Sequence, residues 1–458
     1  MNTAQQLCVI CQRYNTLLIE ETDHTLRIAS SASPTEQMLS ALRFISNKPI
    51  EIEIWPVRRI ALWQALSTLP VNKEVSGLSL TELLNEVLST AIQQRASDIH
   101  FEPGQTTYRI RLRIDGVLHV QPLLPCSIAA QITARLKVLA NLDIAEKRLP
   151  QDGQIDYQDG EHQVSFRVST LPCRYGEKLV LRLQQQHTQS FDIGALGMPA
   201  AEAARFHRAL TSPQGLILIT GPTGSGKTHS LYSALAILNQ IHRNICTVED
   251  PIEIPFSGLN QTQLNTKAGL TYSTLLRALL RQDPDVIMIG EIRDSETADI
   301  AIKASQTGHL VLSTLHTYST IGTLMRLEQL NIPREVLTSS LRLIMTQRLV
   351  RKLCLHCRQQ SKTPSERPLL ATSPALHWQA KGCHRCYSGY YGRTALFEVL
   401  PVSETLGTLI TQGQNAAELE TIARQSGMAT LFENGCRAAD FGITSLEEVY
   451  RVLGHNDG

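Results

Sequence analysis

The chain has 458 residues, enough for roughly two to four domains. Hydrophobic residues make up 42% and charged residues 19%, and 43 basic side chains face 42 acidic ones, so the composition gives no global electrostatic attraction to nucleic acid or to a membrane. The start, MNTAQQLCVICQRYN, lacks the charged and apolar regions of a signal peptide, and no apolar run approaches the ~20 residues that span a bilayer. We therefore expect a soluble, cytoplasmic protein whose association with a membrane, where it occurs, is peripheral.

Residues 1–74 form the first predicted region, which is short and weakly patterned. Its one motif is Cys8-Val-Ile-Cys11. A lone CxxC without a second pair is interpreted as ordinary apolar packing, with a metal or redox role as the alternative.

Residues 75–190 are predicted to form an α+β domain. Apolar side chains at helical spacing indicate a helix over 81–95, and a second helix is expected over 128–142. Alternating apolar and polar residues predict four strands, at 97–103, 107–116, 162–171 and 177–185. The segment 184–198, QQQHTQSFDIGALGM, is a plausible hinge to the next domain.

Three chemically active side chains alternate in the first of these strands. Asp98, His100 and Glu102 must share one face because the side-chain period of a strand is two. Such a set could bind a metal ion. A hydrogen-bonded surface is the favoured interpretation, because no further ligand converges there.

From Ala203 onward, helices alternate with four apolar runs, at 215–220, 244–250, 285–291 and 309–316. Continuous apolar strands between helices predict a largely parallel sheet covered on both faces. Ligands bind such sheets at the carboxyl ends of the strands, and all four runs have polar signatures there. Residues 200–458 are thus predicted to be an α/β domain.

The first run leads into a complete Walker A loop, GPTGSGKT, followed by the helical segment HSLYSALAIL. Its glycines let backbone N–H groups turn toward phosphates, and the following helix presents its N-terminus to the anion. Lys227 is expected to neutralise β- and γ-phosphate oxygens and Thr228 to ligate Mg²⁺ of bound ATP. The predicted nucleotide-binding residues are Gly221, Pro222, Thr223, Gly224, Ser225, Gly226, Lys227 and Thr228.

Two other strand ends carry carboxylates. Glu291 ends the run DVIMIGE, where it could polarise the attacking water. Glu249 and Asp250, in TVEDPIE, could hold the metal through water, or could simply form an acidic turn before Pro251.

His309 and His316 stand at the two ends of the last run. Seven residues of extended chain separate them by about 20 Å, so they cannot share a metal ion. One or both could contact phosphate or a neighbouring domain, or be structural.

Two CxxC units near the carboxyl end supply four thiolates, the number that a closed tetrahedral Zn²⁺ site needs. They are Cys354-Leu-His-Cys357 and Cys383-His-Arg-Cys386, separated by the 25 residues 358–382. Free buried thiols are the alternative. Paired CxxC units also favour metal binding in a reducing compartment over disulfides among the ten cysteines.

Taken in order, these stretches resemble the Walker A, aspartate, Walker B and histidine boxes of the secretion (traffic) ATPases, which power type II secretion and type IV pilus assembly in bacteria. The upstream sequences SDIHFEP, RLRIDG, EKRLPQDG and FRVSTLP, and the carboxy-terminal stretch from Cys354 through GYYGRTALFEV, are similar too, so the resemblance covers about residues 75–458. It implies a RecA-like P-loop motor preceded by a PAS-like domain, with a zinc-binding segment at 350–393. Retraction-type members generally lack the paired CxxC segment, so its presence favours the extension or secretion branch.

The resemblance also implies partners and further site residues. Members are homo-hexamers at the inner membrane, where they act on a platform protein. Some have a longer amino-terminal region that docks onto a membrane-bound protein; the corresponding region here, 1–74, is shorter and weakly patterned. In the family, arginines of the smaller domain reach the nucleotide, and Arg167 and Arg182 sit at matching places. Arg111 and Arg113, which share one strand face, are further candidates.

The leading interpretation is therefore an ATP-hydrolysing motor for pilus assembly or protein secretion. A nucleic-acid motor, such as a helicase or DNA-uptake ATPase, is the main alternative. The near-neutral charge and the lack of a basic, aromatic-rich stripe disfavour it, and no nucleic-acid partner is expected. A regulatory ATP-binding module without turnover is disfavoured because pure binding requires neither Glu291 nor the two histidines.

Overall fold

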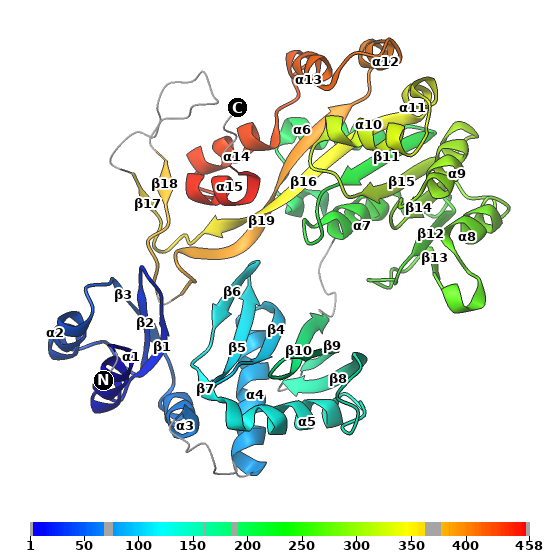
Figure 1. Cartoon of the computed structure of the whole chain (residues 1–458). Coiled ribbons are helices and arrows are strands. Elements are labelled where there is room, and N and C mark those ends of the chain that lie inside the picture. Colours follow the sequence, from blue (N-terminus) through cyan, green and yellow to red (C-terminus); the bar gives the residue numbers. More distant parts are fainter. Residues whose placement is uncertain are drawn as a thin grey trace. The chain divides into compact units, whose positions relative to one another are not determined.

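The structure, a computed structural model, describes residues 3–67, 77–159, 162–184, 191–361, 377–383 and 385–454 (Figure 1). The chain divides into two compact units, residues 1–187 and 188–458. Each unit is described by itself.

The amino-terminal part of the first unit is a small α/β layer, for which the sequence pattern had predicted no elements. Its sheet has the order β1-β2-β3, with β1 and β2 antiparallel and β2 and β3 parallel. Cys11 is buried in its core beside Leu7 and Leu42, whereas Cys8 is exposed. The elements are α1 (Thr3–Arg13), β1 (Leu17–Glu21), β2 (Leu26–Ser30), α2 (Glu36–Ile45), β3 (Ile50–Ile54) and α3 (Val57–Ser67).

The rest of the first unit has the α+β architecture predicted for residues 75–190. Its main path of strands has the order β6-β5-β4-β10-β9-β8, with β7 paired to β5, and all of these pairings are antiparallel. One sheet face contributes Ile99, Phe101 and Leu112 to the core, and the opposite face carries polar side chains, as expected of an antiparallel sheet. The elements are α4 (Gly77–Gln93), β4 (Ala96–Pro103), β5 (Thr107–Ile114), β6 (Val117–Val120), β7 (Leu124–Pro125), α5 (Ala129–Leu139), β8 (Gln151–Asp159), β9 (His162–Cys173) and β10 (Gly176–Gln184).

The four predicted strands and both predicted helices of this domain are confirmed, with ends that differ by a few residues. Strand β8 was not predicted. It follows the stretch EKRLP, and its own sequence, QDGQIDYQD, is polar because it lies at the sheet edge and buries little besides Ile155. Part of the predicted hinge, residues 185–190, lies outside the described residues.

The second unit is built on a seven-stranded sheet of order β13-β12-β14-β15-β11-β16-β19 (Figure 1). All neighbours are parallel except β16 and β19, so the predicted parallel sheet is confirmed. The strands are β11 (Gly215–Thr220), β12 (Ile245–Glu249), β13 (Asn260–Gln263), β14 (Val286–Ile289), β15 (Leu310–Leu315), β16 (Leu341–Leu353) and β19 (Tyr390–Pro401). A separate short pair joins β17 (Gln359–Gln360) to β18 (Trp378–Gln379).

Helices cover both faces of this sheet. Leu216 and Leu218 of β11 point into one core, shared with α8 to α13, and Ile217 and Ile219 into another, shared with α6 and α7. Complete burial on both sides explains why the strand GLILIT is apolar throughout. The helices are α6 (Ala200–Leu210), α7 (Lys227–Leu238), α8 (Tyr272–Leu279), α9 (Ser295–Gln306), α10 (Thr320–Gln329), α11 (Arg334–Ser340), α12 (Glu404–Thr411), α13 (Ala416–Gln425), α14 (Leu431–Asp440) and α15 (Leu446–Leu453).

Candidate functional site

The carboxyl ends of four neighbouring parallel strands bring the predicted boxes to one edge of the sheet. In sheet order, β12 ends at Glu249, β14 is followed by Glu291, β15 is followed by His316, and β11 leads into the phosphate loop, residues 221–228. Because neighbouring strands are about 4.8 Å apart, side chains from adjacent ends can contact one another. The sequence predicted this edge, and the sheet order shows which ends are adjacent.

The phosphate loop joins β11 to α7 through three glycines in conformations that other residues rarely adopt. The φ angles of Gly221, Gly224 and Gly226 are 145°, 78° and 89°. A Cβ atom on Gly221 would also lie 2.6 Å from the carbonyl oxygen of Gln347, and one on Gly226 would lie 2.7 Å from the Gln347 Nε2 atom. Positive φ and close packing both demand glycine here, so the loop has the tight backbone turn that cradles phosphate.

Lys227 is the first residue of α7, and its ammonium group folds back over this loop. Nζ donates hydrogen bonds to the carbonyl oxygens of Gly221, at 2.8 Å, and Pro222, at 3.0 Å. The pKa of Lys227 is lowered to about 8, mainly by burial. The Glu291 carboxylate partly opposes this shift, and the Arg348 guanidinium adds to it. The ammonium therefore lies in a partly desolvated place where an anionic ligand would stabilise its charge.

Glu291 stands at the centre of a charged cluster beside the loop. Its carboxylate accepts hydrogen bonds from Arg293, and His316 Nε2 lies 3.2 Å from Oε2. Arg293 also lies within 3.6 Å of Asp250. Asp294 caps α9 by accepting a bond from the Thr297 N–H at 2.8 Å, which fixes the turn that carries Glu291 and Arg293.

Glu249 lies in a different environment from Glu291. It is 4% exposed, and it accepts hydrogen bonds from the Tyr232 hydroxyl at 2.6 Å, the Thr247 hydroxyl at 2.8 Å and the Gln261 amide at 3.1 Å. Donors therefore occupy both of its oxygens, whereas the neighbouring Asp250 is partly exposed and faces Arg293. Of the two predicted carboxylates, Asp250 is the one that contacts the charged cluster.

The two histidines have different surroundings, as the spacing argument required. His309 precedes β15, and its Nδ1 atom lies 3.0 Å from the carbonyl oxygen of Ala304 in α9. His316 follows β15 and reaches Glu291. Only His316 therefore lies at the strand edge that carries the phosphate loop.

Sequence reasoning missed several side chains that shape this site. Arg293 was inside the quoted stretch DVIMIGEIRD, so attention to its charge could have found it. Tyr232 and Gln261, which bind Glu249, come from distant segments and gave no local signal. Gln347, on the unpredicted strand β16, is 1% exposed and donates to the Ser225 carbonyl at 2.8 Å.

The four predicted cysteines converge at a second place in this unit. Their sulfur atoms all lie within 4.8 Å of one another, with Cys354–Cys383 at 3.8 Å, Cys357–Cys386 at 3.7 Å and Cys383–Cys386 at 3.6 Å. Tetrahedral thiolates at 2.3 Å from Zn²⁺ would be about 3.8 Å apart, so the arrangement fits that ion. Within the described ranges, these four are the one group of three or more acidic, histidine or cysteine residues placed to hold a metal ion.

In the first unit, the polar face of the α+β sheet carries the candidate arginines. Arg167 of β9 is directly opposite Arg182 of β10, which in turn is opposite Asp98 of β4. Arg182 Nε lies 2.9 Å from Asp98, and Arg113 Nε lies 3.7 Å from it. The positive charges of Arg167 and Arg182 repel each other because the two residues are directly opposite. Of the two, Arg182 is the one within hydrogen-bond distance of Asp98.

The remaining predicted residues of that face form ion pairs. Glu102 lies 2.7 Å from Arg111, 3.1 Å from Arg109 and 3.1 Å from Lys178. Although partial burial raises the pKa of Glu102, hydrogen bonds from Arg111 and Lys178 lower it to about 2. His100 lies between these groups, 3.8 Å from Glu102. The face is thus a network of arginines, a lysine and carboxylates. Asp98 and Glu102 are hydrogen-bonded, as expected, whereas His100 has no hydrogen-bond partner among the described residues.

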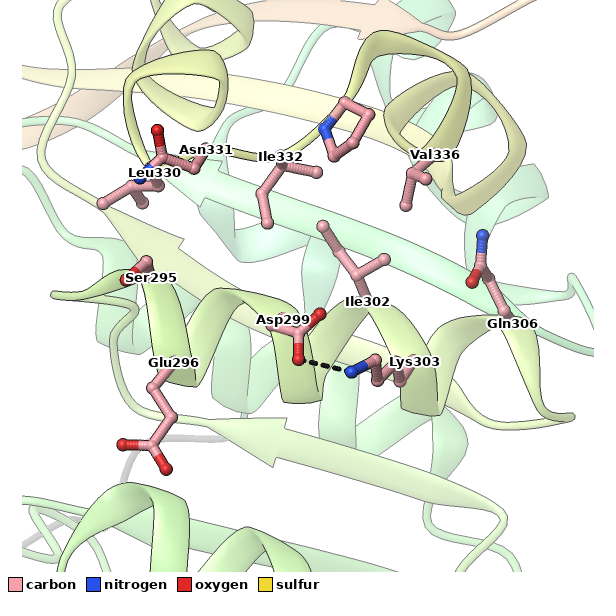
Figure 2. A pocket seen from close by; sticks show the side chains of 11 residues that line it. Ser295, Glu296, Asp299, Ile302, Lys303, Gln306, Leu330, Asn331, Ile332 and Val336 are labelled. Carbon is pink, nitrogen blue, oxygen red and sulfur yellow. Dashed lines mark hydrogen bonds and ion pairs between the residues drawn. The ribbon is translucent and has the colours of Figure 1, made fainter.

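A surface groove of about 500 Å³ lies elsewhere in the second unit, between α9 and the segment joining α10 to α11 (Figure 2). Ile302, Ile332 and Val336 line it, and Lys303 and Asp299 form an ion pair at 2.6 Å on the α9 side. None of the predicted nucleotide-binding residues lines this groove, so the strand edge and not the groove marks the candidate active site.

The chain matches a known protein family, as the combination of a phosphate loop, strand-end carboxylates and paired CxxC units predicted. The family model described as type II/IV secretion system protein matches residues 73–451. The chain belongs to this family. It is 55% identical over 456 residues to the protein transport protein HofB homolog of Escherichia coli, covering 99% of both chains. It is 39% identical to the type IV pilus assembly ATPase PilB of Acinetobacter baylyi, over 97% of this chain and 83% of that one.

The fold of the family is also found among solved structures. The X-ray structure of the Legionella pneumophila ATPase DotB covers 83% of this chain and 97% of its own, with a TM-score of 0.61 at 20% identity. This likeness supports the fold: a RecA-like P-loop domain preceded by a PAS-like α+β domain, here with a four-cysteine segment that fits Zn²⁺.

Membership of the secretion family makes the chain a P-loop ATPase of the pilus-assembly and secretion class, with ATP and Mg²⁺ as its ligands. No finding favours a nucleic-acid motor. None of the helices in the described part of the chain combines the length and apolarity needed to cross a membrane.

Proposed function

We propose that this ATPase works as a homo-hexamer at the cytoplasmic side of a bacterial inner membrane, where it drives the assembly of pilin-like subunits or the secretion of protein through a membrane-embedded platform protein. The observation that carries the proposal is the row of catalytic boxes along one sheet edge of a chain that belongs to the type II/IV secretion family. The four-cysteine segment favours the extension or secretion branch.

The contacts of each residue at the phosphate-loop edge of the sheet suggest its role in ATP hydrolysis. Lys227 binds phosphate oxygens, and Thr228 at the start of α7 ligates Mg²⁺. Glu291 orients and polarises the attacking water, because it is the carboxylate beside both the loop and His316. Asp250 contacts the same cluster through Arg293, and Glu249, with its oxygens hydrogen-bonded to protein groups, holds the end of β12 in place.

Arg167 and Arg182 together are proposed as an arginine clamp that contacts the γ-phosphate when the two units close on ATP. Their direct register concentrates positive charge that Asp98 only partly neutralises, and a polyphosphate would relieve the repulsion between them. Closure would then depend on the presence of the γ-phosphate, which links hydrolysis to movement.

The tetracysteine segment is proposed to be structural. A site with four thiolate ligands has no open coordination position for chemistry, and its zinc would tie β16 to the start of β19. Residues 1–74 are proposed as the docking region, for which a membrane-anchored protein is the candidate partner, and 75–190 and 200–458 as the PAS-like and motor domains.

The test of the motor function has two arms. Purified full-length protein should hydrolyse ATP as a six-subunit particle, measured by analytical ultracentrifugation, and single-stranded DNA or RNA should leave the rate unchanged. In cells that lack the gene, the wild-type protein should restore pilus assembly or secretion, whereas Glu291→Gln at equal abundance should not. A rate that requires nucleic acid would support the helicase alternative instead.

A further inference from the structure

Strand β16 runs past the end of β11 and so reaches the level of the phosphate loop. Thr346 pairs with Thr220, the last residue of β11, and their hydroxyl oxygens are 2.8 Å apart. The next two residues of β16, Gln347 and Arg348, therefore lie beside the point where the chain leaves the sheet to form the loop.

Gln347 contacts the loop directly. Its Nε2 atom donates to the Ser225 carbonyl at 2.8 Å, and its Oε1 atom accepts from the Ser230 hydroxyl at 2.7 Å. The Gln347 carbonyl oxygen packs against Gly221 so closely that a Cβ atom there would lie 2.6 Å away. The backbone that carries Arg348 is thus held against the loop.

Arg348 is a buried cation at this place, with 7% of the residue exposed. Its guanidinium donates to the carbonyl oxygens of Gln347, at 2.9 Å, and Tyr318, at 3.3 Å. Tyr318 belongs to the segment after β15 that also carries His316. The guanidinium therefore lies between the phosphate loop and the His316 segment, and both of these partners are neutral carbonyl groups.

Against the larger lowering by burial, two acidic groups raise the pKa of Arg348: the Tyr318 phenol, whose ring centroid lies 5.4 Å from the guanidinium carbon, and the Glu398 carboxylate, which makes its hydrogen bonds to other groups. Glu398 of β19 has an electrostatic effect on Arg348, but its carboxylate accepts from the Thr320 N–H and hydroxyl, at 2.8 and 2.7 Å, and from the Leu431 N–H at 3.2 Å. Among the described residues, no carboxylate lies at ion-pair distance from the Arg348 guanidinium. A buried guanidinium in such a place is costly, and an anionic ligand would lower that cost.

The charges around the loop point to the same ligand. Burial lowers the pKa of Arg348, and Arg348 in turn lowers the pKa of Lys227, so the two cations affect each other. Glu291 is the carboxylate that raises the pKa of Lys227. Binding of a polyphosphate beside both cations would stabilise both, and a planar guanidinium fork suits phosphate oxygens.

We propose that Arg348 is a phosphate-binding residue of the same subunit, a second cation that contacts the polyphosphate of ATP beside Lys227. This inference deepens the proposed function, since it assumes that Lys227 binds the phosphates. It adds an arginine from the motor domain itself to the two clamp arginines of the PAS-like domain.

The test measures the affinity of the full-length protein for Mg²⁺·ATPγS by calorimetry, with the melting temperature as the control for folding. Arg348→Gln should weaken binding by about tenfold or more, the effect of losing a charge-assisted hydrogen bond, at a nearly unchanged melting temperature. Arg342→Gln is the matched control. Arg342 also belongs to β16, and its guanidinium donates to the carbonyl oxygens of Gln214 and Ser339. It lies near the start of the strand, away from the phosphate loop.

Glu398→Gln, alone and combined with Arg348→Gln, separates phosphate binding from charge balance in the core. If Arg348 only balances the charge of Glu398, Arg348→Gln will lower the melting temperature without weakening ATPγS binding. Adding Glu398→Gln to that variant will then restore the melting temperature. That combination of results overturns the inference. If Arg348→Gln does not fold, Arg348→Lys decides, because it keeps the charge but loses the fork: weaker binding supports the inference and unchanged binding overturns it.

Lys227→Ala in the same titration distinguishes the two levels of proposal. If Lys227→Ala binds ATPγS normally, the proposal that Lys227 binds the phosphates is wrong, and the role of Arg348 that rests on it is wrong too. Lost binding by Lys227→Ala together with normal binding by Arg348→Gln would overturn only the role of Arg348.

Discussion

The Glu291 carboxylate lies 3.2 Å from His316 Nε2, although 24 residues separate the two in the chain. The two residues follow β14 and β15, which are adjacent parallel strands. Arg293 contacts the same carboxylate from the side of α9. Glu291 is thus held between two groups that can fix its orientation toward the phosphate loop, which is what a water-orienting carboxylate requires.

Glu291→Gln should preserve ATP binding and slow hydrolysis by at least ~10²-fold, the scale of a lost general base. Steady-state turnover and ATPγS affinity measure the two effects. Glu296→Gln, an exposed position on α9 that pairs with Arg277, is the control and should leave both unchanged. A collapse of binding would make Glu291 structural and would leave the Glu249-Asp250 pair as the better candidate.

Lys227→Ala should abolish turnover and leave the fold intact. The ammonium contacts only loop carbonyls at hydrogen-bond distance among the described residues, so its loss removes phosphate binding more than it removes packing. Circular dichroism and an ATPase assay check the prediction. Lys303→Ala, which removes an exposed ion pair on α9, should behave like the parent. Near-normal turnover of Lys227→Ala would contradict the phosphate-loop assignment.

The affinity for ATP should fall as pH rises above about 8. In the free protein burial lowers the pKa of Lys227 to about 8, so below that pH the ammonium is already charged, and above it binding must take up a proton. Bound phosphate raises the pKa again, and affinity should drop by up to about tenfold per pH unit between the free and bound values.

Titrations from pH 7 to pH 9.5, with calorimetry in two buffers of different ionisation enthalpy, measure this proton uptake. Lys227→Arg is the control, because a guanidinium keeps its charge throughout this range. An affinity that is flat across the range in the parent protein would contradict the lowered pKa.

The purified protein should contain one zinc ion per chain. Four sulfur atoms within 4.8 Å of one another form a complete site, and its metal contributes directly to the stability of the fold around it. Elemental analysis measures the content, and chelation should lower the melting temperature of the carboxy-terminal part. Cys383→Ser should lose zinc and the exposed Cys173→Ser should keep it. Metal-free protein that melts like the parent would contradict the prediction.

Arg167→Ala and Arg182→Ala should each strongly reduce turnover at unchanged zinc content. Each removes one arginine of the proposed clamp, so the two units should fail to close when ATPγS is added, as small-angle scattering can measure. Arg174→Ala, an exposed arginine at the turn between β9 and β10, is the control. A clamp variant that closes and hydrolyses like the parent would place the phosphate contact elsewhere, with Arg111 and Arg113 next to test.

The sequence determined what depends on local rules. The strand GLILIT is apolar because it is buried on both faces, and the loop after it shows its glycines, lysine and threonine in one continuous stretch. Glu291 and His316 could be selected because each ends a recognisable strand of a parallel sheet, where ligands bind. The two CxxC units indicated zinc by number and spacing alone.

Tertiary structure decided what depends on the order of the strands and on pairings between distant segments. That β14 and β15 are adjacent, so that Glu291 meets His316, follows from the sheet order and not from any stretch of sequence. That Tyr232 and Gln261 donate hydrogen bonds to the Glu249 carboxylate likewise follows from the tertiary structure and not from the stretch TVEDPIE. Gln347 and Arg348 gave no signal because their strand β16 had no motif, and its register on β11 alone places them at the phosphate loop. The physical reason is the same in each case: the partners are brought together by long-range packing, which local residue patterns do not encode.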